Sequence, residues 1–177
     1  MIFSRGARKL ALTAHVAGSV GWFGAVSAFL VLAIAGVGSS DAELARSAYS
    51  SMRLIAWWMI VPLCLASLVS GVVQSLGSRW GLLRHYWVVA KLAATVIATL
   101  ILIRHLPTID RAADAAAAGA LSAELGQTRL QLLVHAAGGL AVLLVTTAVS
   151  VYKPRGLTRY GARLERGRSG SADVRLG

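Results

Sequence analysis

The sequence predicts an all-α membrane protein in which four transmembrane helices form one bundle. Hydrophobic residues make up 56% of the 177 residues, whereas charged residues make up 14%. The apolar residues come in long blocks, unlike the spaced pattern of a soluble amphipathic helix. A membrane-spanning helix needs about 20 mostly apolar residues. Four segments meet this requirement within a single domain, residues 1–152, and we expect spans at about residues 10–37, 54–76, 85–103 and 130–151.

The first span has some features of a signal peptide. Three basic residues precede it, and Ala-Val-Ser-Ala at 25–28 resembles a cleavage site. Its apolar run over 10–37 is, however, longer than the usual signal-peptide core of about 7 to 15 residues, and it contains His15. We therefore expect a retained spanning helix.

Small residues recur along the first span at alternating steps of three and four: Ala11, Ala14, Gly18, Gly21, Ala25 and Ala28. Such a seam lets another helix approach closely. Small residues beside a histidine also leave room for a flat cofactor, and the sequence alone is compatible with both interpretations.

The charge distribution predicts the orientation in the membrane. Basic residues occupy the N-terminus, the turn between spans two and three, and the tail, whereas the acids Asp41, Glu43, Asp110, Asp114 and Glu124 fall in the other two loops. Both termini should therefore be cytoplasmic. The net charge of +11 comes from bases next to spans and in a tail, residues 153–177, that we expect to be disordered. This arrangement favours anionic lipid over nucleic acid as the partner.

A further helix is expected between spans three and four. After Pro107 and Thr108 come strong helix formers, interrupted at Gly119. We expect a short extracytoplasmic helix that lies outside the bilayer.

Three ionisable side chains lie inside the predicted spans: His15, Lys91 and His135. Such groups are costly in hydrocarbon and usually functional. With a rise of about 1.5 Å per residue, His15 and Lys91 share a level, whereas His135 enters from the opposite side and lies roughly 14 Å away along the bundle. The two histidines should therefore not form one axial pair.

Several roles are open for these residues. Lys91 can extend to the headgroups, pair with an anionic group, or bind a cofactor propionate. His15 and His135 can hydrogen-bond between helices, titrate, or ligate haem iron or copper. His85 and His105, at the two ends of span three, need no special purpose as interfacial residues, although His105 is a possible partner for His135.

A resemblance bears on this choice. The run His15-Val-Ala-Gly-Ser-Val-Gly-Trp-Phe-Gly24, followed by Trp87-Val-Val-Ala-Lys-Leu92, resembles a pattern shared by CopD-like copper-resistance proteins, HemJ-type protoporphyrinogen oxidases and uncharacterised predicted integral membrane proteins. The uncharacterised branch is the most similar. The resemblance implies a four-helix bundle in the bacterial inner membrane, with His15 as a haem ligand and Lys91 as the partner of a porphyrin carboxylate.

The sequence thus favours a redox cofactor, most simply b-type haem, used for electron transfer or haem handling. His15 is the axial ligand, Trp22 lies two turns further on the same helical face, and Lys91 neutralises a propionate. His135 is a second cofactor or metal ligand, and copper is the second candidate cofactor. The alternative is a non-catalytic scaffold, homo-oligomer or subunit of a larger complex. Phosphate loops, zinc spacings and nucleophile elbows are absent, which excludes the usual hydrolases and transferases.

Overall fold

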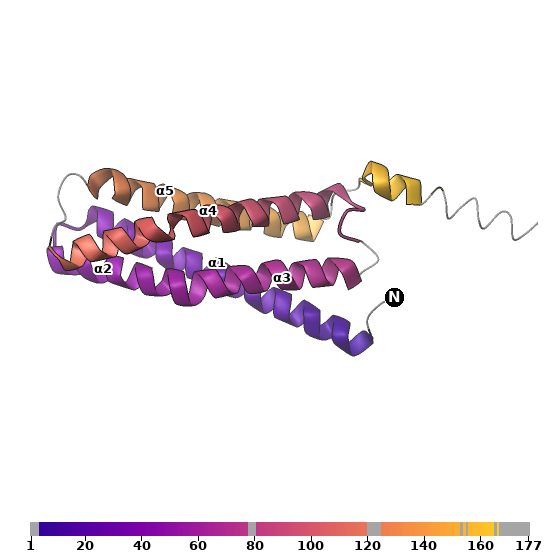
Figure 1. Ribbon diagram of the computed structural model, residues 1–177, viewed down its shortest axis with the longest axis horizontal. Helices are drawn as coiled ribbons and strands as arrows, with labels where there is room; N and C mark the ends of the chain where they lie inside the picture. Colours follow the sequence, from indigo (N-terminus) through magenta and orange to yellow (C-terminus); the bar gives the residue numbers. More distant parts are fainter. Residues whose placement is uncertain are drawn as a thin grey trace, which may run out of the picture.

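The protein is an antiparallel bundle of long helices (Figure 1). The computed structural model describes residues 4–77, 81–119, 125–152, 154, 156–164 and 166. The helical elements are α1 (Arg5–Gly38), α2 (Ala42–Ile55), η1 (Ala56–Ile60), α3 (Val61–Gly77), α4 (Tyr86–Ala117) and α5 (Leu125–Tyr152). Four helical segments are long and apolar enough to cross a membrane, and within the described ranges there is no strand. The predicted all-α, four-span, multi-pass membrane protein is confirmed.

The second span is one continuous rod made of α2, η1 and α3. Its middle, Ala56–Ile60, is a wider π-helical turn in which the Val61 N–H donates to the carbonyl of Ala56, five residues earlier. The turn ends just before Pro62, which has no N–H to donate to the preceding turn. A local shift in hydrogen-bond register there is a common adjustment.

The four spans are arranged in a ring, and each span packs against the two beside it. The α2–α3 rod and α5 both pack against α1, and the same rod and α5 pack against α4. Helices α1 and α4 are therefore diagonal partners, as are α3 and α5. Figure 1 shows the N-terminal half of α1 diverging from the other helices.

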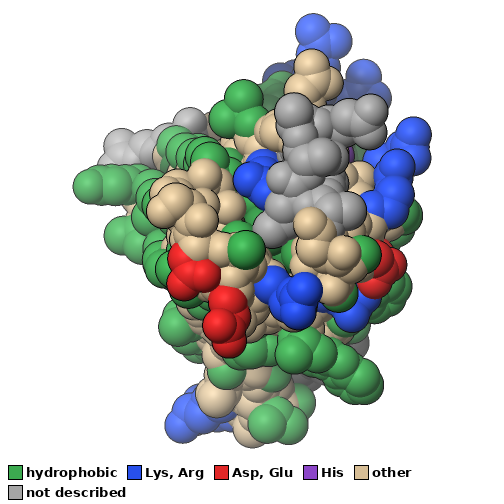
Figure 2. Space-filling view, turned by 90° about the vertical axis from the view of Figure 1, so that its left-hand side faces the viewer, with side chains coloured by type: hydrophobic (Ala, Val, Ile, Leu, Met, Phe, Trp, Pro, Cys, Tyr) green, Lys and Arg blue, Asp and Glu red, His purple; other side chains and the backbone are tan. Residues whose placement is uncertain are grey.

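The two ends of the bundle differ in charge. We call the end at the α1–α2 and α4–α5 connections the acidic end, because the described acids lie toward it: Asp41, Glu43, Asp110 and Asp114. Figure 2 looks onto this end and shows acidic and basic side chains grouped there, with apolar side chains around them. The opposite end carries Arg5, Arg8, Lys9 and Arg84, and we call it the basic end.

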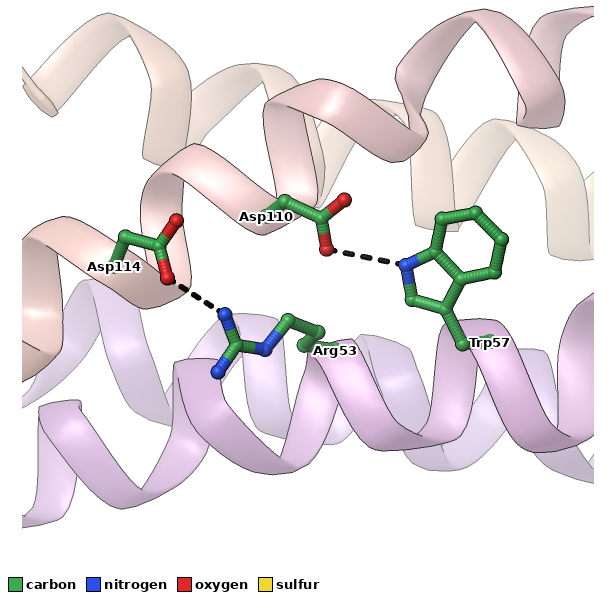
Figure 3. A network of polar contacts seen from close by, with 4 residues as sticks. All are labelled: Arg53, Trp57, Asp110 and Asp114. Atoms are coloured by element: carbon green, nitrogen blue, oxygen red, sulfur yellow. Dashed lines mark hydrogen bonds and ion pairs between the residues drawn. The ribbon is translucent and has the colours of Figure 1, made fainter.

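Polar contacts at the acidic end join the second span to α4 (Figure 3). The Arg53 guanidinium donates to Asp114 with Nη1–Oδ1 at 2.6 Å, and the indole N–H of Trp57 donates to Asp110 at 3.1 Å. In each helix the two residues are four apart, so they lie on one face. These contacts fix the register between the two helices.

The segment after Pro107 does not form the separate helix that the sequence predicted. Residues 107–117 are helical but continue α4 without a break. The expectation was wrong on this point because Ile109, Ala112, Ala113 and Ala116 are buried in the bundle, so packing extends the helix past the proline. The rest of the predicted segment, residues 120–124, lies outside the described residues.

Part of the tail makes contacts with the bundle. Residues 156–164 dock on the turn before α4, where the Thr158 N–H donates to the Arg84 carbonyl at 3.0 Å and the Thr158 hydroxyl to the Leu83 carbonyl at 2.6 Å. A Cβ on Gly161 would lie only 2.4 Å from the Arg84 oxygen, so this approach requires glycine. Composition alone did not show these contacts, because they depend on a turn distant in sequence.

Candidate functional site

His15 lies at the contact between α1 and α3. Its Nδ1 is 3.1 Å from the carbonyl oxygen of Ser67 and 3.1 Å from the hydroxyl of Ser70. A carbonyl oxygen only accepts, so Nδ1 carries the proton and donates it. The Ser70 hydroxyl donates its own proton to the Ala66 carbonyl at 2.6 Å. Its oxygen therefore accepts from Nδ1 of His15, together with the Ser67 carbonyl.

This hydrogen bonding determines what the His15 ring can do. With the proton on Nδ1, the second ring nitrogen, Nε2, carries the lone pair in the neutral form. A histidine that ligates a metal usually donates its other ring N–H to a carbonyl or carboxylate, which orients the ring. His15 therefore has the arrangement of a ligand whose tautomer is fixed by α3.

A glycine makes room for the ring. A Cβ built on Gly71 would meet Cε1 of His15 at 3.1 Å, so the imidazole lies directly against the α3 backbone. A Cβ built on Gly18 would lie 3.5 Å from the backbone N of Ser67, so this glycine also packs closely against α3. The seam predicted along α1 is used in part for helix packing within the chain: Gly18 and Ala25 are buried, whereas Ala14 and Ala28 are exposed.

Lys91 reaches across the bundle to α5. Its ammonium group donates a hydrogen bond to the hydroxyl of Ser150, which in turn donates to the carbonyl of Thr146 at 2.8 Å. The contact between His105 on α4 and His135 on α5 aligns these two antiparallel helices. Lys91 lies 14 residues before His105 and Ser150 lies 15 residues after His135, so the two are within about one residue of the same level. The side chain therefore extends sideways to α5 instead of toward the headgroups at the basic end.

The predicted common level of His15 and Lys91 is consistent with the contacts between helices. Cys64 on α3 lies 3.1 Å from the Thr99 hydroxyl on α4, which aligns these two antiparallel helices. Counting seven residues from Cys64 reaches Gly71, beside His15, and counting eight back from Thr99 reaches Lys91. The two side chains also lie within electrostatic range of each other.

Within the described part of the chain, no carboxylate accompanies His15 or Lys91. Among the residues that the structure describes, all four acids lie in the half of the bundle toward the acidic end, and the one ion pair there joins Arg53 to Asp114. An ammonium group inside a membrane normally has an anionic partner. The partner of Lys91 is the neutral hydroxyl of Ser150, so the positive charge of Lys91 is still available to an anionic ligand.

Trp22 is buried in the main core, with 5% of its surface exposed. It follows His15 by seven residues, so it lies two turns further on the same face of α1. Its indole N–H is buried without a hydrogen-bond partner, and so is the amide nitrogen of Gln74, close to Gly71 along α3. Buried donors of this kind are uncommon and call for an explanation such as a ligand or an internal water.

His135 belongs to a different place. Its ring stacks on that of His105, with centroids 3.8 Å apart and planes tilted by 38°. Thirteen residues, counted along α3 and α4 through the Cys64–Thr99 contact, separate the levels of His15 and His135, a distance of about 20 Å along the bundle. They cannot be the two axial ligands of one iron. This agrees with the prediction from the sequence that the two histidines do not form one axial pair.

The sequence reasoning missed several partners. It named His105 as a possible partner for His135, but it did not identify Ser67, Ser70 or Gln131 as partners. Their pairings depend on contacts between helices that no local pattern encodes. One signal was available, since Gln131 and His135 are four residues apart and so share a face of α5.

Metal ligands do not gather in large groups here. Across the described part of the chain, no three side chains of histidine, cysteine, aspartate or glutamate come together. Comparison of the chain with protein-family models, with curated proteins and with solved structures found no match. The functional conclusion therefore depends on the geometry of the two polar sites.

Proposed function

We propose that this protein binds b-type haem in the half of the bundle toward the basic end and uses it for electron transfer or haem handling in the bacterial cytoplasmic membrane. The observation that carries the proposal is the pairing of an oriented histidine with a lysine that has no acidic partner among the described residues. His15 offers Nε2, and Lys91 offers a positive charge at the same level.

The donor set fits the cofactor. Haem iron takes an axial imidazole, and the hydrogen bond from Nδ1 of His15 to the Ser67 carbonyl orients the ring and increases its basicity as a ligand. Propionate groups are anionic, and burying them in a membrane is costly unless a cation is near. Lys91 meets this need and is held in place by the Ser150 hydroxyl.

Haem, when bound, supplies one-electron redox chemistry. The chain's own residues would hold and tune the site: His15 would ligate the iron, Ser67 and Ser70 fix the tautomer of His15, and Lys91 would compensate negative charge. Compensating a propionate and increasing ligand basicity both change the reduction potential, because they alter the charge felt by the iron.

The test is a visible absorption spectrum of the detergent-purified chain, oxidised and then reduced with dithionite, after expression with ample haem. We expect a Soret band and reduced-state peaks that are lost in His15→Ala. The matched control is His135→Ala, which removes the other histidine inside a span and should leave the spectrum unchanged.

Lys91 provides a second, graded test. Lys91→Met should lower the haem content or the reduction potential, whereas Lys91→Arg, which keeps the charge, should retain most of both. A colourless wild-type protein would refute the haem proposal and favour the alternative of a scaffold, to be tested by copurification of a partner.

A further inference from the structure

We propose that the docked tail segment, residues 156–164 with Arg166, binds anionic phospholipid headgroups through an arginine face of its short helix. The segment follows the last candidate span and docks on the turn that precedes the third. Two span ends therefore border it, which places it at the membrane surface. Figure 1 shows it as a short yellow helix beyond the last turn of α5. The proposal does not depend on haem binding.

The docking fixes where the tail helix begins and how it is oriented. Residues 159–164 are helical, and Thr158 is the N-cap, because its hydroxyl oxygen accepts from the Gly161 N–H at 3.1 Å. Before the cap, the Tyr86 N–H donates to the Gly156 carbonyl at 3.4 Å. These contacts, with those of Thr158 to the turn, hold the helix in one register, so its faces have defined directions.

The helix has three distinct faces. Gly161 is buried against the turn. Since a helix turns by about 100° per residue, exposed arginines spaced by four and three residues lie together on the side opposite this glycine. These are Arg159, Arg163 and Arg166. Tyr160 and Leu164 lie on the flank between the two faces and are 59% and 45% exposed.

The chemistry of these faces fits a phospholipid. Guanidinium groups bind phosphate oxygens in a bidentate manner, and basic clusters beside a span attract anionic lipid. The one ion pair among the described residues joins Arg53 to Asp114 at the other end of the bundle, so no described carboxylate pairs with the arginine face. Tyr160 and Leu164 add an aromatic and an aliphatic side chain, which suit the boundary between headgroups and acyl chains. A soluble anion would have no use for that flank.

The experiment measures lipid binding to the purified full-length chain in a neutral detergent by native mass spectrometry. The probe is phosphatidylglycerol, and zwitterionic phosphatidylcholine is the reference. We expect the wild type to retain phosphatidylglycerol preferentially. Arg159→Gln/Arg163→Gln/Arg166→Gln should weaken this binding on the order of 100-fold, because each basic residue near an anionic surface contributes about fivefold.

A second triple variant separates the arginine face from general charge. Arg5→Gln/Arg8→Gln/Lys9→Gln removes the same charge at the same end of the bundle and should keep most of the preference. Equal losses in the two triple variants would show that only diffuse charge attracts the lipid, and would overturn the proposal. Displacement of the lipid by an equal concentration of inorganic phosphate would assign the face to a soluble anion and overturn it as well.

The role of docking is tested without removing any charge. A Cβ on Gly161 would lie 2.4 Å from the Arg84 carbonyl oxygen, so Gly161→Ala should force the helix off the turn and reduce the preference. Gly156→Ala is the matched control, because its Cβ would make an ordinary contact with Tyr86 at 3.7 Å. Helix content by circular dichroism and elution in gel filtration establish that each variant is folded. Binding by Gly161→Ala equal to that of the wild type would show that docking does not build the face.

Discussion

The two halves of this bundle are built differently. Toward the acidic end, α1, the second span, α4 and α5 share a buried core that includes Tyr49, Met52 and Cys64. Toward the basic end, the first part of α1, residues 5–17, has no buried residue, and Figure 1 shows this part leaving the bundle. The contacts of His15 and Lys91 in that half are polar.

This difference separates the packed core from the proposed haem site. Close packing of apolar groups supplies most of the stabilisation in a bundle. His15 and Lys91 lie where that packing is sparse, and their contacts are hydrogen bonds to single hydroxyl or carbonyl groups. Binding sites are commonly drawn from the less stable parts of a structure, because a ligand needs groups that are not already used.

The largest expected effect is in the packed half. Met52 is completely buried, with 0% exposure, so Met52→Ala should lower the free energy of unfolding by about 2–5 kcal/mol. Met59, seven residues later and 46% exposed, is the matched control. Met59→Ala should change the free energy of unfolding by less than about 0.5 kcal/mol. Reversible unfolding in mixed detergent and SDS would measure both. Equal losses would contradict the proposed location of the core.

An intermediate effect is expected at the contact between His15 and Gly71. A Cβ at position 71 would lie only 3.1 Å from Cε1 of His15. The methyl groups of Gly71→Val should therefore push the imidazole ring away from the Ser67 carbonyl. Overpacking of this kind costs about 1–3 kcal/mol. We expect lower stability and, if haem is bound, a weakened Soret band.

Gly24→Val is the control for this change. Gly24 is on the same helix as His15, and a Cβ there would meet nothing within 4 Å. Its stability and spectrum should match those of the wild type. A normal spectrum in Gly71→Val would show that the position of the His15 ring is not set by α3.

The smallest effect is expected for the ion pair at the acidic end. Arg53 and Asp114 are 40% and 70% exposed, so solvent screens the pair despite its short distance. Asp114→Asn should cost at most about 1 kcal/mol. A double-mutant cycle with Arg53→Gln isolates the pairwise coupling, which should fall as salt is added. Coupling well above this limit would show that the pair lies in a less polar environment than its exposure indicates.

Local patterns predicted much of the fold. The four spans follow from block hydrophobicity, because a lipid environment demands long apolar helices whatever they pack against. The segment after Pro107 shows the limit of local rules: proline and threonine favoured a break, yet four buried residues on α4 hold the helix together beyond them. The same holds for Thr158 and Gly161, whose docking depends on a turn more than 70 residues away.

By itself, the sequence determined that this chain crosses a membrane four times and that His15, Lys91 and His135 lie inside the crossing segments, because both depend only on composition and on the rise of a helix. The tertiary structure alone decided which groups meet. It paired His15 with Ser67 and Ser70, Lys91 with Ser150, and His135 with His105. The reason is physical: the depth of a residue follows from counting along one helix, whereas its partner depends on how separate helices rotate and pack against each other.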